Sequence, residues 1–115
     1  MASTGWLLRD GEVLAALEVA ETFSERSRGL LGRPGLAGAL LLRPARSVHS
    51  MGMQFALDVA FCDRELVVRR TVCLSPGRLT RPTLRSGCVI EAEYGSFDRW
   101  RLRPGDQLEV REVEG

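Results

Sequence analysis

Turn-forming residues divide the apolar segments of this chain into short pieces. Twelve glycines and five prolines are spread over 115 residues, and they recur between runs of apolar side chains. Runs of this length suit strands of about 4–8 residues better than helices of ten or more. We therefore predict a mainly β (α+β) fold, in which six to eight short strands and two short helices form one compact barrel- or sandwich-like domain over residues 1–115.

The N-terminal part of the chain has the pattern of a hairpin followed by a helix. Asp10-Gly11 separates two apolar runs and supplies the positive φ that a tight turn needs. Thr22 and Glu25 have the spacing of a capping box, which predicts a short helix from about Ser24 to Leu31. The brief apolar run from Leu36 to Leu42 is predicted to be a buried strand.

Two apolar runs, Leu57–Asp63 and Leu66–Leu74, predict a second hairpin around the turn 63–66. A four-residue turn sets a register in which Phe61 lies opposite Val68. In the same register Arg69 lies diagonally across from Asp58, within reach of an ion pair.

The C-terminal part of the chain contains two further predicted strands, Cys88–Glu93 and Gln107–Val113. Between them, Ser96 is placed to cap a helix of one or two turns that ends near Trp100.

The charges are unevenly distributed, although the net charge is only +1. Residues 1–25 carry one arginine and five acids, whereas residues 66–90 carry five arginines and no acid. Guanidinium groups match carboxylates and phosphates, so the segment from Arg69 to Arg85 could border an anion site. Residues 66–90 contain no aromatic side chain for base stacking, and nucleic-acid binding is therefore not favoured.

Neither the hydropathy pattern nor the N-terminal sequence points to a membrane. The longest stretch without a charged residue is 47–57, well short of a bilayer span. The N-terminus lacks the basic start and apolar run of a secretory signal, so we predict a cytoplasmic protein.

The cysteines and the single histidine do not have the spacing of a metal site. Cys62, Cys73 and Cys88 are predicted to be buried free thiols in a reducing compartment. His49, Met51, Met53 and Phe55 share one face if the segment is extended, and their soft atoms suit Cu(I). Methionines at alternating strand positions more often fill a core, so we predict no metal. The glycines form no nucleotide-binding motif, so we predict no cofactor.

Several separate segments together resemble one family. They are Glu25–Arg33, Ala39–Leu42, Met53–Asp63, Val89–Glu91 followed by Gly95, and Leu102–Asp106. In these segments, and over nearly the whole chain, the sequence resembles a widespread uncharacterised prokaryotic family, domain of unknown function 192. Ala56 departs from a common Pro, and Glu65-Leu66 departs from the usual Asp-Gly turn. The resemblance implies a compact mainly β fold and brings no activity with it.

Polar residues on or near the predicted central strands are the candidate ligand-binding residues. They are His49, Gly52, Met53, Asp58, Arg69 and Glu91. The leading hypothesis is a non-enzymatic module that binds a small anionic or polyhydroxy ligand. The alternative is a glycan-active hydrolase or lyase in which His49, Asp58 and Glu91 act as acid and base, which requires these three side chains to converge. The identity of the ligand and the oligomeric state stay open.

Overall fold

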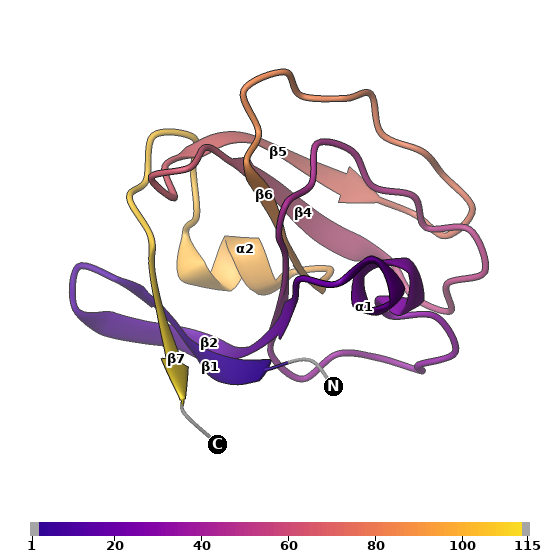
Figure 1. Ribbon diagram of the computed structural model, residues 1–115, viewed down its shortest axis with the longest axis horizontal. Helices are drawn as coiled ribbons and strands as arrows, with labels where there is room; N and C mark the ends of the chain where they lie inside the picture. The colour runs from indigo at the N-terminus through magenta and orange to yellow at the C-terminus, as the bar shows by residue number, and fades with distance from the viewer. Residues whose placement is uncertain (1–2, 114–115) are drawn as a thin grey trace.

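The chain folds around one curved sheet, seen in a computed structural model that describes residues 3–113 (Figure 1). The elements follow in the order β1 (Ser3–Arg9), β2 (Glu12–Ala20), α1 (Phe23–Arg28), β3 (Ala39–Leu42), β4 (Leu57–Cys62), β5 (Val68–Leu74), β6 (Cys88–Glu93), α2 (Ser96–Trp100) and β7 (Glu109–Val113). The predicted mainly β fold with two short helices is confirmed over this range. Neither helix in residues 3–113 has the length and apolar character needed to cross a bilayer.

The strand order in the sheet is β5-β4-β6-β3-β2-β1-β7. Strands β2 and β3 are parallel, and the crossover between them is supplied by α1 and residues 29–38. At one end the two edges of the sheet meet. There the Val68 N–H donates to the Asp106 carbonyl oxygen at 2.9 Å, and the Leu108 N–H donates to that of Leu66 at 2.9 Å. These bonds curl the sheet toward a barrel and protect part of both edge strands.

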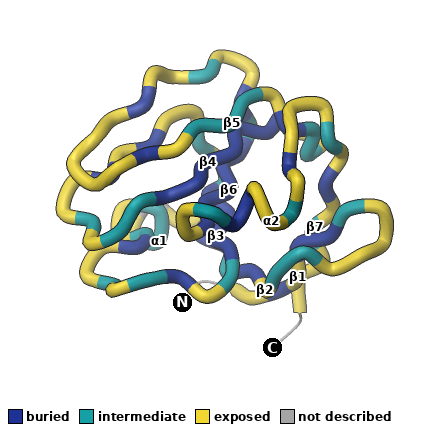
Figure 2. The backbone as a smooth tube through the Cα atoms, turned by 180° about the vertical axis from the view of Figure 1, so that it is seen from behind, coloured by how far each residue is buried: buried dark blue, intermediate teal, exposed yellow. Residues whose placement is uncertain are grey.

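The curved sheet carries a hydrophobic cluster on each face. The inner face, which the curl encloses, packs against Phe97 and Trp100 of α2, whose rings lie 5.6 Å apart between centroids. The outer face packs against Leu30, Leu36 and Val48 from the segments that follow α1 and β3. Because β4 and β6 lie between the two clusters, their residues are buried on both faces (Figure 2).

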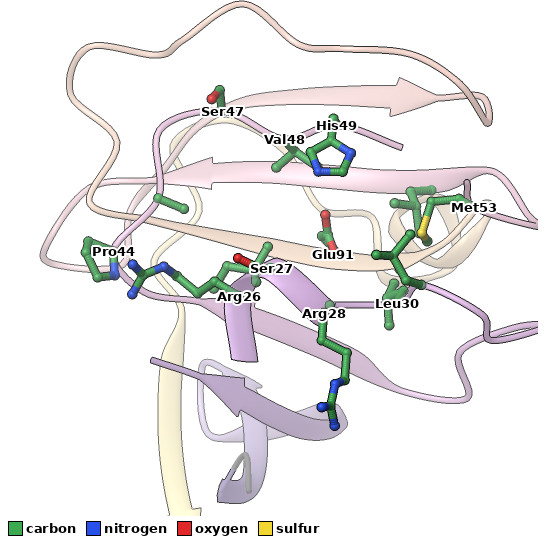
Figure 3. Close-up of a pocket in the computed structure, with 15 residues that line it drawn as sticks. Arg26, Ser27, Arg28, Leu30, Pro44, Ser47, Val48, His49, Met53 and Glu91 are labelled. Atoms are coloured by element: carbon green, nitrogen blue, oxygen red, sulfur yellow. The ribbon is translucent and has the colours of Figure 1, made fainter. Parts of the chain in front are cut away.

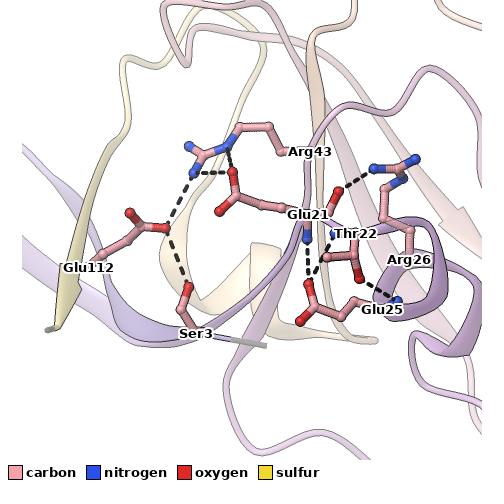
Figure 4. A network of polar contacts seen from close by, with 7 residues as sticks. All are labelled: Ser3, Glu21, Thr22, Glu25, Arg26, Arg43 and Glu112. Carbon is pink, nitrogen blue, oxygen red and sulfur yellow. Dashed lines mark hydrogen bonds and ion pairs between the residues drawn. The ribbon is translucent and has the colours of Figure 1, made fainter. Parts of the chain in front are cut away.

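The local signals in the N-terminal part are confirmed. Asp10 and Gly11 both have positive φ, 52° and 78°, at the turn between β1 and β2. The Thr22 hydroxyl accepts from the Glu25 N–H at 3.1 Å, and the Glu25 carboxylate accepts from the Thr22 N–H at 3.1 Å, which completes the capping box (Figure 4). The helix is shorter than predicted because Gly29 ends it directly after Arg28.

The second hairpin forms at the predicted place but in a different register. Phe61 lies opposite Arg70 and not opposite Val68. The shift of two residues has two causes. Leu66 adopts a positive φ of 65° and lengthens the turn by one residue, which accounts for half of the shift. A β-bulge directly after Phe61 accounts for the second residue.

The segment through His49, Met51 and Met53 is not extended, so the condition for a shared face of these side chains is not met. The Met53 N–H donates to the Ser50 carbonyl oxygen at 3.1 Å and closes a turn, in which Gly52 has a φ of 75°. The alternation of faces is therefore lost. His49 and Met51 are exposed, while Met53 packs against the outer cluster.

The cysteine prediction is correct for two of the three thiols. Cys62 and Cys88 lie opposite each other on β4 and β6 and are buried in the inner cluster. Cys73 is exposed, contrary to the prediction. It lies on the edge strand β5, beyond the end at which the two edges of the sheet are joined, so its side chain has fewer neighbours to cover it.

Gly38 has no room for a side chain, because a Cβ there would lie 2.4 Å from the Ala16 carbonyl oxygen. We expect Gly38→Ala to lower the free energy of unfolding by about 1–3 kcal/mol, since the backbone at the start of β3 must shift. Urea denaturation measures this loss. Gly35→Ala is the matched control and should cost less, because its nearest neighbour is the flexible carboxylate of Glu93 at 3.3 Å. Equal stability of Gly38→Ala and the wild type would contradict this close packing.

Candidate functional site

A carboxyl group is buried on the outer face at the centre of the sheet. It belongs to Glu91 in β6, which is only 4% exposed. Leu40 of β3 and Val59 of β4 are its cross-strand neighbours. Ile90 and Ala92 on either side of it face the inner cluster, so strand alternation turns Glu91 to the outer face. An ionisable side chain thus lies in an otherwise apolar layer.

This carboxyl group has no hydrogen-bond or ion-pair partner within residues 3–113. Burial raises the pKa of Glu91 from its ordinary value of 4.5 to about 7, because the apolar surroundings disfavour the charged form. Near neutral pH the group is therefore both an acid and a base, able to donate a hydrogen bond or to accept one.

The Glu91 carboxyl lines a pocket of about 200 Å³, here called the Glu91 pocket (Figure 3). Helix α1 with the residues after it forms one wall, and residues 44–49 form another. The lining residues with polar side chains are Arg26, Ser27, Arg28, Ser47, His49 and Glu91. The carboxyl group points toward His49, whereas the guanidinium groups of Arg26 and Arg28 point away from it (Figure 3).

The other polar side chains of the pocket are available to different degrees. The His49 Nδ1 accepts from the Met51 N–H at 3.3 Å, so the neutral ring carries its proton on Nε2 and can donate there. Arg26 is engaged with the Glu21 carbonyl oxygen. Arg28 is exposed and has no partner among the described residues. The pocket therefore combines a buried carboxyl with an imidazole donor and a free cation at its rim.

Asp58 is not part of this pocket. It lies on the inner side of β4, where its Oδ2 accepts from the Gly95 N–H at 2.9 Å and from the Phe97 N–H at 3.0 Å. The Asp58 carboxylate, from β4, therefore caps the N-terminus of α2. The prediction that Ser96 caps this helix is wrong, because its N-cap is Gly95 and the cap acceptor comes from β4.

The predicted ion pair between Asp58 and Arg69 is also wrong. The shifted register places Asp58 opposite Cys73. Arg69 pairs instead with Asp63, with 2.6 Å between Nη2 and Oδ2. Asp63 also accepts from the N–H groups of the following turn, and the hydrogen bond from Val67 is the main reason that the pKa of Asp63 is lowered.

The hydrolase or lyase alternative required His49, Asp58 and Glu91 to converge. The two carboxyl groups point to opposite faces of the sheet, with Asp58 beside α2 and Glu91 in the pocket. Both hydrogen bonds of the Asp58 Oδ2 support the scaffold. The three side chains therefore cannot act together on one substrate.

Of the remaining candidates, Met53 lines the Glu91 pocket and Gly52 lies in the adjoining turn. Arg69 is separate from the pocket. With Arg85 it lines two other hollows, of about 460 and 440 Å³, beside β5. The structure thus brings together Glu91, His49 and Met53, with Gly52 next to them. Within residues 3–113 no three His, Cys, Asp or Glu side chains lie together in a way that could hold a metal ion.

Arg26, Ser27, Arg28 and Ser47 were not among the predicted site residues. The capping box located α1 in the sequence, but it did not indicate which strand the helix would lie against. One signal could have identified Arg26, Ser27 and Arg28, because these three residues lie in the segment Glu25–Arg33 that carries part of the family resemblance.

A curved seven-stranded sheet in residues 3–113, with a small pocket on its outer face, defines a class of small β proteins and not an activity. The model of the family DUF192, described as "Uncharacterized ACR", matches residues 6–110. The chain belongs to this family. No curated protein matches the chain.

Two solved structures share this fold. One is a protein of unknown function from Novosphingobium aromaticivorans DSM 12444, with 18% identity and a TM-score of 0.75 over 94% of this chain and 84% of that one. The other is a putative transcription regulator from Sinorhizobium meliloti 1021, with 20% identity and a TM-score of 0.79 over 96% of this chain and 94% of that one. At such identities the likeness concerns the fold.

Replacing Asp58 should destabilise the protein through α2. We expect Asp58→Ala to lower the free energy of unfolding by about 2 kcal/mol, because it removes the cap and leaves the buried Phe97 N–H unpaired. Urea denaturation followed by circular dichroism measures the loss. Asp98→Ala is the control, since that exposed acid in the same helix should change stability by less than about 0.5 kcal/mol. Similar stabilities for the two variants would refute the capping role.

Glu91 should make stability depend on pH. The unfolded side chain ionises near pH 4.5 and the folded one near pH 7. The folded state therefore holds the proton more tightly, and stability falls as the pH rises from 4.5 to 7. Two and a half pH units correspond to about 3 kcal/mol.

We expect Glu91→Gln to abolish this fall, so that the wild type loses about 3 kcal/mol more than the variant between pH 4 and pH 8. Denaturant titrations at a series of pH values measure the difference. Glu93→Gln, which changes the next outward-facing acid on β6, should keep the wild-type profile. Parallel profiles for Glu91→Gln and the wild type would show that the carboxyl is not held in its neutral form.

Proposed function

We propose that the Glu91 pocket binds a small polyhydroxy molecule, and that the protein is a binding module and not an enzyme. The observation that carries this proposal is the unpartnered Glu91 carboxyl, which is 4% exposed and lines the pocket. No side-chain oxygen or nitrogen of the described residues is both fully enclosed and without a hydrogen bond, so the Glu91 oxygens remain accessible from the pocket. A ligand hydroxyl in the pocket would replace solvent there and give the carboxyl a hydrogen bond that the protein does not supply.

The chemistry of the lining favours hydroxyl groups. A hydroxyl both donates and accepts, so it can bond Glu91 in either protonation state. The His49 Nε2–H can donate to a second hydroxyl, and Ser27 and Ser47 add hydroxyl groups to the lining. A negative group on the ligand is repelled by ionised Glu91 but would be matched by Arg28 at the rim. The pocket therefore accepts a neutral polyol, or a hydroxy acid whose carboxylate lies toward Arg28.

The size of the pocket limits the ligand. Pockets for drug-sized ligands have about 300–1,000 Å³, and this one has about 200 Å³. A compound of three or four carbon atoms fits that volume better than a sugar ring. Glycoside hydrolysis uses two carboxyl groups that flank the scissile bond, whereas Glu91 is the one carboxyl residue among the described residues that line this pocket. These features support binding over hydrolysis.

Glycerol and D-glycerate are suitable probes, with propionate as an analogue that lacks hydroxyl groups. A probe at ten times its dissociation constant adds about 1.4 kcal/mol to stability, which raises the melting temperature by several degrees. We expect this shift for at least one hydroxyl-bearing probe and not for propionate. Glycerol should bind more tightly at pH 8 than at pH 6, because ionised Glu91 is the stronger acceptor.

Glu91→Gln should remove the pH dependence of glycerol binding and weaken the affinity about tenfold, whereas Glu93→Gln should change neither. Nuclear magnetic resonance titration of the amides of residues 26–31 and 44–49 locates the bound probe. The absence of a shift with every hydroxyl-bearing probe would overturn the proposal. Binding that Glu91→Gln leaves unchanged would do the same.

A further inference from the structure

A second hollow lies on the outer side of the sheet, over β1, β2 and the segment that precedes β3. It has a volume of about 490 Å³, within the range of about 300–1,000 Å³ that is usual for ligand pockets. Its side-chain lining includes Trp6, Glu18, Arg33 and Leu36. It shares no lining residue with the Glu91 pocket. We call it the Trp6 hollow.

Trp6 contributes a half-exposed indole to the hollow. The side chain is 46% exposed and belongs to neither hydrophobic cluster, while its neighbour Leu7 is fully buried in the inner one. Its cross-strand neighbours are Ala16, whose side chain is small, and Arg111. Exposed tryptophans concentrate at recognition sites, because they offer a large rigid apolar surface together with one hydrogen-bond donor.

Glu18 and Arg33 contribute an ion pair to the lining of the same hollow. The Arg33 Nη1 and Nη2 donate to the two carboxylate oxygens of Glu18 at 2.7 and 3.0 Å. The two charges neutralise each other, so the hollow has no net charge to attract an ion. Each carboxylate oxygen keeps a free lone pair, and Arg33 keeps unused N–H groups. The pair can therefore accept from one hydroxyl and donate to its neighbour.

We infer that the Trp6 hollow binds a neutral sugar ring, with the apolar C–H face of the ring against Trp6 and two adjacent hydroxyls on Glu18 and Arg33. The indole and the ion pair together match the two kinds of surface that such a ring presents. An ionic ligand would gain nothing from the neutral pair, and an aliphatic ligand would leave its polar atoms unpaired. The volume of about 490 Å³ admits a sugar ring and exceeds the 200 Å³ of the Glu91 pocket.

The test is a titration with the methyl glycosides of glucose, galactose, mannose and N-acetylglucosamine and with cellotriose, followed by tryptophan fluorescence and calorimetry. We expect saturable binding of at least one probe. Trp6→Ala should weaken this binding by more than about tenfold, and Trp6→Phe should weaken it less. Glu18→Gln should weaken it several-fold by disrupting the fork of hydrogen bonds.

The control variants are Tyr94→Ala, which removes another exposed aromatic ring, and Glu12→Gln, which removes an exposed acid at the other end of β2. Both should bind the probe as the wild type does, and so should Glu91→Gln, which separates this test from that of the proposed function. Melting curves establish that the Trp6 variants are folded. The inference is overturned if no probe binds saturably, or if Trp6→Ala and Glu18→Gln both bind as well as the wild type.

Discussion

Strand β6 is enclosed on all sides: it has a hydrogen-bonded neighbour on each edge and a packed layer on each face. The other elements are arranged so that they cover it. Strands β4 and β3 pair with its two edges. The curl of the sheet and α2 cover its inner face, while α1 and the segment after β3 cover its outer face. A strand enclosed in this way is normally apolar throughout. Glu91 is the exception, and the pocket beside it is the place where the outer layer is incomplete.

Two carboxyl groups with the same chemistry therefore have opposite roles. Asp58 accepts two backbone hydrogen bonds from Gly95 and Phe97, so its charge is compensated and it stabilises the connection between β4 and α2. Glu91 has no such donor within the described residues, and burial raises its pKa to about 7. A group that lowers stability and faces a cavity is typical of a binding site, since function often depends on residues that the fold alone would not favour.

Most features that depend on residues close together in the sequence were predicted correctly, and most features that depend on distant residues were not. The turn at Asp10-Gly11, the capping box of Thr22 and Glu25 and the strand Cys88–Glu93 depend on neighbouring residues, and all three are confirmed. The register of the second hairpin was wrong because a positive φ at Leu66 and one bulge are small local changes with a large effect. The candidate residues grouped Glu91 with His49, Gly52, Met53, Asp58 and Arg69. The structure keeps His49 and Met53 beside Glu91, with Gly52 in the adjoining turn, and separates Asp58 and Arg69 from it. The contribution of α1 to the pocket was not predicted.

The sequence by itself determined the fold class, because apolar runs of this length between turns suit strands, and strands satisfy their backbone hydrogen bonds by pairing in a sheet. It also determined that polar side chains would lie among apolar ones on the central strands. Only the tertiary structure decided to which face each of them points, because one inserted residue reverses a strand's alternation. The tertiary structure also decided which distant segments cover each face of the sheet. As a result the Asp58 carboxylate caps α2 and the Glu91 carboxyl lines a pocket. That choice depends on contacts between residues far apart in the chain, and local sequence patterns do not encode them.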